Sequence, residues 1–138
     1  MLQIGKVAKQ SSVGVETVRF YENKGLIAAP KRNASGYRQY SESVVKQIQF
    51  IQHAKSLGFS LREVRELIAL RGERGARCKG IKETAIAKIA DIQQKIDSLE
   101  KMKMALQPLV DQCRASGPIS DCPILGALDN DNNLTKKE

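Results

Sequence analysis

The chain has 138 residues, a formal net charge of +8 and a pI of about 9.6. This length allows one compact domain with an extension and excludes two full domains. The charge favours a polyanionic partner, although a basic surface kept only for solubility remains an alternative. Residues 1–70 carry 11 Lys or Arg against 5 Asp or Glu, whereas residues 71–138 carry 12 against 10. We therefore expect nucleic acid to contact the N-terminal half.

The N-terminus reaches polar residues at once, and no apolar run approaches the length of a membrane span. We therefore expect a cytoplasmic protein without a membrane partner, in which thiols stay reduced. Its three cysteines are an odd number and form no closed disulfide framework, so metal or redox chemistry is the better expectation.

Two short helices joined by a tight turn are predicted near the N-terminus. Apolar positions at Ile4, Val7 and Ala8 predict the first, and Ser and Gly residues at 11–14 then interrupt the pattern. The second starts at Val15 and ends at Gly25, a residue typical of a helix C-terminus. This is a helix-turn-helix pattern, whose second helix would lie in the major groove of DNA. The predicted DNA-binding residues of this helix are Val15, Thr17, Arg19 and Tyr21, with Tyr21 as a phosphate donor.

A small β-hairpin is predicted next, because Pro30 stops any helix and a turn at 33–36 separates two basic, aromatic segments. Such a wing would place side chains against the DNA backbone beside the groove. The predicted contacts are Lys31, Arg32, Tyr37 and Arg38. The alternative is a solvated basic loop, but Tyr37 and Tyr40, if exposed, would need a reason.

Two further helices complete a DNA-binding domain of residues 1–70. The first, 41–57, has Ser41 as its predicted N-cap, and the second runs from Ser60 to about residue 70, with Glu63 completing a capping box. The predicted inward-facing residues are Val44, Val45, Ile48, Ile51, Leu57, Leu61, Val64, Leu67 and Ile68. His53 has no Cys or carboxylate neighbour at ligand spacing, so we expect no metal there.

Residues 71–80 are a predicted hinge connector, and residues 81–112 a predicted dimerisation helix. Its heptad seam is Ala85, Ile89, Ile92, Ile96, Leu99, Lys103, Leu106 and Val110. Between these positions, Lys88, Asp91, Lys95, Asp97, Glu100 and Lys101 are expected to form a solvated face. A narrow seam favours a partner helix, here the same helix of a second copy, over packing onto its own domain.

The cysteines lie at both ends of this helix. A rise of ~1.5 Å per residue would separate Cys78 from Cys113 by roughly 50 Å, so they cannot share a ligand within one subunit. In an antiparallel dimer, Cys78 of one copy would meet Cys113 and Cys122 of the other. If the three thiols form one site, the dimer must therefore be antiparallel and the site shared.

Residues 113–128 are a predicted metal-binding loop and short terminal helix, and residues 129–138 a predicted disordered tail. Gly117 and Pro118 allow the loop to fold tightly between its two cysteines. The alternative is that the three cysteines are inert.

Several motifs together resemble the MerR family of bacterial transcription regulators. They are Ile4-Gly5-x-Val7-Ala8, Val15-Glu16-Thr17-Val18-Arg19-Phe20-Tyr21, Gly36-Tyr37-Arg38-x-Tyr40 and Leu57-Gly58-Phe59-Ser60-Leu61-x-Glu63-Val64. The resemblance implies a mainly α fold: a winged helix-turn-helix domain with a small β-hairpin wing, followed by a long antiparallel coiled-coil dimerisation helix. It also implies an effector site at the ends of that helix.

The spacing of Cys78, Cys113 and Cys122 resembles the heavy-metal-responsive branch, in which the first cysteine is associated with divalent ions. The zinc sensors add a cysteine beside the one matching Cys113, and often a loop histidine; this chain has neither. Three thiolates without a fourth strong ligand suit Hg(II), or Pb(II) or Cd(II). An oxygen from Asp111 or Asp121 would keep Cd(II) or Zn(II) possible.

The resemblance implies that a homodimer binds a near-palindromic operator in double-stranded promoter DNA. Metal would make it distort the DNA so that RNA polymerase can engage, at a deformation energy on the order of a few kcal/mol. A thiol-redox-responsive regulator of the same fold is the alternative, and a purely architectural DNA-binding protein would leave the cysteines idle. An enzyme is not expected, because His53 has no evident catalytic partner.

Overall fold

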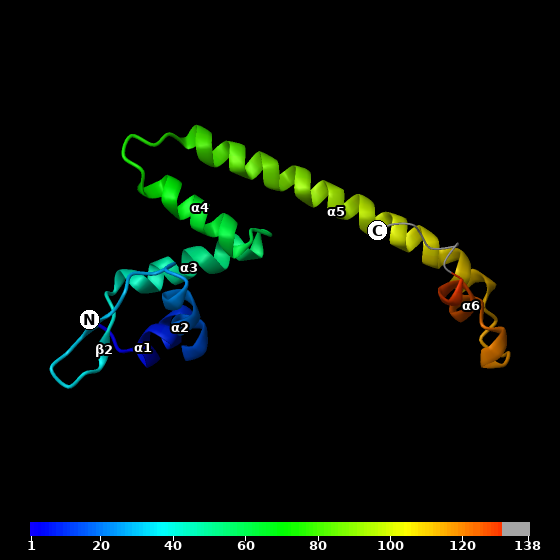
Figure 1. Ribbon diagram of the computed structural model, residues 1–138, viewed down its shortest axis with the longest axis horizontal. Helices are drawn as coiled ribbons and strands as arrows, with labels where there is room; N and C mark the ends of the chain where they lie inside the picture. The colour runs from blue at the N-terminus through cyan, green and yellow to red at the C-terminus, as the bar shows by residue number, and fades with distance from the viewer. Residues whose placement is uncertain (131–138) are drawn as a thin grey trace. The chain divides into compact units, whose positions relative to one another are not determined.

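The computed structural model describes residues 1–130, which form six α-helices, one 3-10 helix and a two-stranded hairpin (Figure 1). One compact unit spans Met1–Lys88, and a second begins at Ile89. The connector without helix is shorter than the predicted hinge, because α4 (Leu61–Gly72) and α5 (Cys78–Gln112) leave only residues 73–77 between them. The first unit therefore includes the first turns of α5.

The predicted helix-turn-helix is formed by α1 (Ile4–Ser11) and α2 (Val15–Asn23). Ser12 adopts the left-handed region at φ 59°, and the Val13 N–H donates to the Ala8 carbonyl at 3.0 Å. At the end of α2, Gly25 has φ 72° and the Leu26 N–H donates to the Tyr21 carbonyl at 2.9 Å. This hydrogen bond and backbone conformation are those of a Schellman motif, which explains the glycine.

The predicted wing is confirmed as an antiparallel hairpin of β1 (Lys31–Arg32) and β2 (Arg38–Gln39). Asn33 orders its turn, because its Oδ1 atom accepts hydrogen bonds from the N–H groups of Ser35 and Tyr37, each at 3.0 Å. The N-terminus extends the hairpin, since Leu2 and Tyr40 exchange two backbone hydrogen bonds of 2.8 and 2.7 Å.

The core of the first unit lies between α1, α2, α3 (Ser43–Ser56) and α4. Tyr40 belongs to this core at 0% exposure, whereas Tyr37 is exposed. Its hydroxyl donates to Glu22 Oε1 at 2.6 Å, and Glu22 Oε2 lies 3.6 Å from Arg38 Nε. The second tyrosine of the Tyr-x-x-Tyr segment therefore anchors the wing to α2.

Tyr40→Phe is expected to lower the free energy of unfolding by about 1 kcal/mol at neutral pH, because it removes this hydrogen bond. Burial, the hydrogen bond and the charge of Glu22 raise the pKa of Tyr40 to about 12. The unfolded phenol ionises near pH ~10, so the contribution is complete below that pH and lost as the pH rises towards 12. Urea unfolding at neutral and alkaline pH should show a smaller alkaline loss for the variant; equal losses would contradict this assignment.

Helices α3 and α4 follow the predicted pattern with two corrections. Ser41 is not the N-cap of α3, which is Glu42, although Ser41 Oγ accepts from the Ser43 N–H at 3.3 Å. Leu57 is exposed rather than inward-facing, because the chain turns at Gly58, which has φ 97°. The predicted capping box of α4 is confirmed, with Ser60 and Glu63 bonded to each other's backbone N–H groups.

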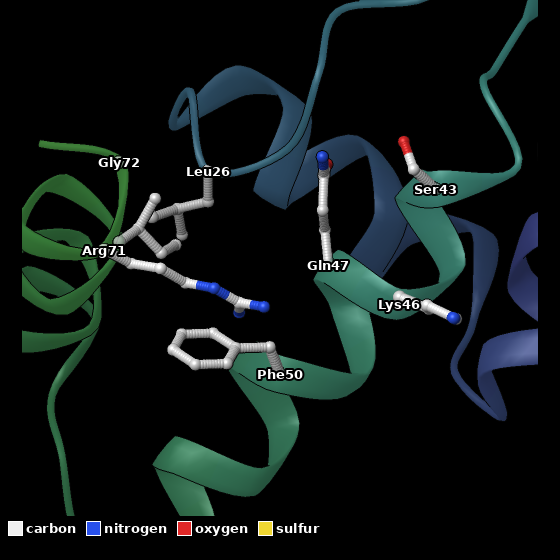
Figure 2. A pocket seen from close by; sticks show the side chains of 8 residues that line it. Leu26, Ser43, Lys46, Gln47, Phe50, Arg71 and Gly72 are labelled. Atoms are coloured by element: carbon white, nitrogen blue, oxygen red, sulfur yellow. The ribbon is translucent and has the colours of Figure 1, made fainter. Parts of the chain in front are cut away.

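A cation–π contact joins α3 and α4 on the side shown in Figure 2. The Arg71 guanidinium lies over the Phe50 ring, 5.2 Å from its centroid. The surrounding hollow of about 530 Å³ is lined by Leu26, Ser43, Lys46, Gln47, Phe50, Ile68, Arg71 and Gly72. It offers no thiol, imidazole or carboxylate, so it is unsuited to a soft metal ion.

Helix α5 has 35 residues and carries the predicted apolar seam. In the single chain the large apolar residues of its seam are exposed, including Ile89, Ile92, Ile96 and Leu99. Lys88 corrects the expectation of a solvated face, since it is only 7% exposed and its Nζ lies 2.8 Å from Glu63 Oε1.

After α5, the chain forms a 3-10 helix (Ile119–Asp121) and α6 (Pro123–Asp129). The predicted disordered tail starts at Asp129, but that residue ends α6. Residues 131–138 of the tail lie outside the described residues. No helix in residues 1–130 is both long enough and apolar enough to cross a membrane.

Candidate functional site

Three arginines from α2 and the hairpin meet around one small surface hollow. Its volume is about 180 Å³, and it is lined by Gln3, Ile4, Arg19, Arg32, Gly36, Tyr37 and Arg38. Arg19 is exposed on α2, and Arg32 is held by a 2.7 Å hydrogen bond from its Nη1 to the Gly36 carbonyl. Guanidinium groups gathered beside an exposed helix form a surface suited to phosphate groups.

The eight predicted DNA-binding residues differ in exposure, and one of them is buried. Arg19, Lys31, Arg32 and Tyr37 are exposed, while Val15, Thr17 and Arg38 are half-buried. Tyr21 does not fit the prediction, because it is only 1% exposed and its hydroxyl accepts a 3.0 Å hydrogen bond from Gln52 Nε2. Burial also raises its pKa. Its position, one turn after Val18, directs it into the core.

The sequence patterns did not predict that Gln3 and Ile4 lie beside these arginines. Both residues line the same hollow, here called the arginine hollow, from the start of α1. The helical pattern gave no signal for this, because their proximity to Arg32 depends on the Leu2–Tyr40 pairing that carries the N-terminus along the hairpin.

Two of the three predicted metal ligands lie in one loop. Cys113 directly follows α5, and Cys122 is the N-cap of α6, whose Gly126 N–H donates to the Cys122 carbonyl at 2.9 Å. Both thiols are free, half-buried and line the same hollow of about 400 Å³, together with Asp121. Asp111 instead lies on α5, where its Oδ1 accepts from Gln107 Nε2 at 3.1 Å.

The third predicted ligand, Cys78, is the first residue of α5 and is exposed. Within residues 1–130 of a single chain, no three His, Cys, Asp or Glu side chains lie together as a metal site. The loop supplies two soft thiols on one hollow, a donor set that fits Hg(II), Pb(II) or Cd(II).

Family models match both halves of the chain. A model described as "MerR HTH family regulatory protein" matches residues 2–71, and one described as "MerR, DNA binding" matches residues 45–109. The chain belongs to the MerR family. It is therefore a DNA-binding transcriptional regulator and not an enzyme.

Relatives of this MerR-family regulator are named for metal response. It is 37% identical over 126 residues to a mercuric resistance operon regulatory protein of Bacillus cereus, covering 91% of this chain and 96% of the relative. Its structure resembles the transcription regulator PbrR691 from Ralstonia metallidurans in complex with lead(II), with TM-score 0.83 and 30% identity over 93% of this chain and 99% of that one. It also resembles MerR from Bacillus megaterium in complex with mercury(II), with TM-score 0.68 and 32% identity over 94% and 100% of the chains.

The family expected from the motifs is thus confirmed, as are the mainly α fold and the hairpin wing. The long helix that follows the DNA-binding unit is likewise present as α5.

Proposed function

We propose that this MerR-family chain is a metal-responsive transcription activator that acts as an antiparallel homodimer in the cytoplasm. Each of two sites would combine Cys78 of one copy with Cys113 and Cys122 of the other. The observation that supports it is the arrangement of thiols on α5: an exposed thiol begins the helix, and a two-thiol loop follows its end. Only pairing with a reversed second copy joins these ends.

The α5 seam supplies the surface for that pairing. Its large apolar side chains are exposed in the single chain. Burying them against a second copy would remove apolar area from water along the length of the helix, at roughly 25 cal/mol per Å². The heptad spacing favours a coiled coil over a globular interface.

The metal we favour is Hg(II), followed by Pb(II), Cd(II) and Zn(II). Three thiolates with no fourth thiol or imidazole suit an ion that accepts trigonal sulfur coordination. Asp121 lines the same hollow as the two loop thiols, so it is the better placed of the two aspartates to add an oxygen for a larger ion. The relatives named for mercury and lead support this choice of metals.

Promoter DNA would lie across the arginine hollow, with α2 in the major groove and the hairpin on the backbone. The proposed contacts are Val15, Thr17, Arg19, Lys31, Arg32, Tyr37 and Arg38; Tyr21 is left out because it is buried. Metal-dependent distortion of the DNA between promoter elements would then allow RNA polymerase to engage. The metal must bind the distorting state more tightly by an energy comparable to the deformation.

Arginine substitutions should separate base contacts from phosphate contacts. Arg19→Ala, on α2, is expected to cost about 1–3 kcal/mol of binding and to relax base preference. Arg32→Ala, on the hairpin, is expected to weaken binding to all DNA sequences similarly. It should also reduce the slope of log K against log salt concentration by about 1 in magnitude. Fluorescence anisotropy over a salt series, with selected and scrambled duplexes, measures both effects. Loss of base preference in Arg32→Ala alone would reverse these two assignments.

The proposed function is tested by competition among Hg(II), Pb(II), Cd(II) and Zn(II) for the reduced protein. The expected result is a thiolate charge-transfer band for one metal, two metals bound per dimer and metal-dependent transcription from the bound promoter. Full metal-dependent transcription in each of the single variants Cys78→Ser, Cys113→Ser and Cys122→Ser would contradict the proposed function. A response to oxidants but to none of the four metals would instead establish the thiol-redox regulator.

A further inference from the structure

The first three turns of α5 belong to the same compact unit as the DNA-binding helices. Lys88 is the last residue of that compact unit, and Ile81 packs against its core. Gly80 lies beside Leu70 of α4, since an added Cβ would be 3.5 Å from Leu70 Cδ2, an ordinary van der Waals distance. The seam thus divides into a part that belongs to the DNA-binding unit and a part, from Ile89 on, that does not.

Lys88 makes a polar contact at this junction. Its Nζ lies 2.8 Å from Glu63 Oε1 and 5.8 Å from the centroid of the Phe59 ring. Phe59 and Glu63 flank the start of α4, where the Ser60 N–H donates to the same Glu63 oxygen at 2.8 Å. One carboxylate oxygen therefore receives a donor from α5 and a donor from the cap of α4.

This contact differs from a surface ion pair because its cation is buried. The Lys88 side chain is 7% exposed, so sliding α5 along α4 would separate a buried ammonium group from this carboxylate. Separating the two partners of a buried ion pair is unfavourable. The pair Lys95–Asp91, two turns further along the same helix, is the contrast: its Nζ–Oδ2 distance is 3.2 Å, but its lysine is 68% exposed.

We propose that Lys88 is a positioning residue that transmits displacement of the dimerisation helix to the DNA-binding unit, through Glu63 and the cap of α4. The proposal rests on the proposed function, because it assumes that metal binding changes how α5 lies. With the contact intact, α4 and the first turns of α5 move as one body. Without it, metal still binds at the thiols and DNA still binds at the arginine hollow, but the two events are less well coupled.

The variants that test this are Lys88→Met and Glu63→Gln, alone and together, with Lys95→Met as the matched control. Methionine replaces the buried ammonium by an apolar chain, and Glu63 is 30% exposed, so its carboxylate can take water instead. Glutamine keeps an oxygen for the Ser60 N–H and removes the charge. Lys88→Arg keeps the cation and should therefore keep the wild-type behaviour in part.

The coupling is measured with Hg(II) and a DNA duplex that the wild-type protein selects from a random pool. The duplex carries a donor fluorophore at one end and an acceptor fluorophore at the other. In Lys88→Met, the Hg(II)-induced change in end-to-end energy transfer should fall below about half of the wild-type change, while Hg(II) and DNA affinities stay within about twofold. The Hg(II)-induced change in the double variant should be no smaller than in the more affected single variant, because the two substitutions remove the same contact. A full Hg(II)-induced change in Lys88→Met, or an equal loss in Lys95→Met, would overturn the proposal.

The anchoring itself is measured without metal or DNA, by amide hydrogen exchange of the dimer. Residues 80–88 of α5 should exchange about tenfold faster in Lys88→Met than in the wild type or in Lys95→Met. Unchanged exchange would overturn the proposal even where Hg(II) acts normally. If wild-type protein shows the anchoring but no Hg(II)-induced change in the duplex, the mercury response has failed and with it the role of Lys88 in transmitting it.

Discussion

Mixing two variants that have each lost tight Hg(II) binding is expected to restore part of it. Cys78→Ser alone should weaken Hg(II) binding by more than about 100-fold, since loss of even an outer-shell partner of a metal ligand costs roughly 10–100-fold. The double variant Cys113→Ser/Cys122→Ser should lose binding as well. In a mixed dimer of the two, one proposed site regains all three thiols, and the other keeps none.

Random exchange of subunits makes about half of the dimers mixed, and each mixed dimer has one complete site out of two. The mixture should therefore contain about a quarter as many tight Hg(II) sites as the wild type. The measurement is a thiolate absorbance titration after subunit exchange, under reducing conditions. Native mass spectrometry with one subunit tagged serves as the control for exchange, because it resolves the mixed dimer from the two parent dimers. No recovery in an exchanged mixture would mean that the thiols do not form a shared site, and the proposed antiparallel dimer would lose its main support.

A single cysteine placed on the α5 seam is expected to cross-link to the same cysteine of the second copy at some positions and not at others. In a chain with all three cysteines changed to Ser, Ile96→Cys should link to itself through a short bis-maleimide. The proposed two-fold axis passes near that residue, because Cys78 must lie level with the loop of Cys113 and Cys122. Ala85→Cys should not link to itself, but should link to Val110→Cys in a mixture.

The contrast follows from helix geometry. Ala85 and Val110 are separated by roughly 35–40 Å along one helix, so neither can reach its own copy in an antiparallel pair. In a parallel pair, every seam position would lie opposite itself, and Ala85→Cys would link to itself efficiently. Lys95→Cys, off the seam, measures random collision. Efficient self-linking at Ala85 would exclude the antiparallel dimer and the shared metal site together.

Most elements of the fold could be predicted from short-range sequence patterns. The Ser60–Glu63 capping box, Gly25 after α2, the hairpin turn at Asn33 and the α5 heptads each depend on residues within a few positions of one another. Local hydrogen bonds and helical periodicity act over that range, so the pattern alone carries the information.

The candidate site was predictable to a different extent at each end of the chain. Cys113 and Cys122 are nine residues apart in a Gly-Pro loop, and the structure places both on one hollow. The exposed arginines were predicted from charge, the helix-turn-helix pattern and the hairpin, but the position of Gln3 beside the same hollow was not. Gln3 lies there because residues 2 and 40 pair.

Sequence by itself therefore determined the order of the helices, the wing, the apolar seam and the three thiols, since these are written in neighbouring residues. Only the tertiary structure decided which polar residues are buried. Sequence patterns did not place Tyr21, Tyr40 or Lys88 in the interior, yet each side chain is buried and bonded to a residue far along the chain, namely Gln52, Glu22 and Glu63. A polar group can leave water when a distant partner satisfies it, and folding alone brings such partners together.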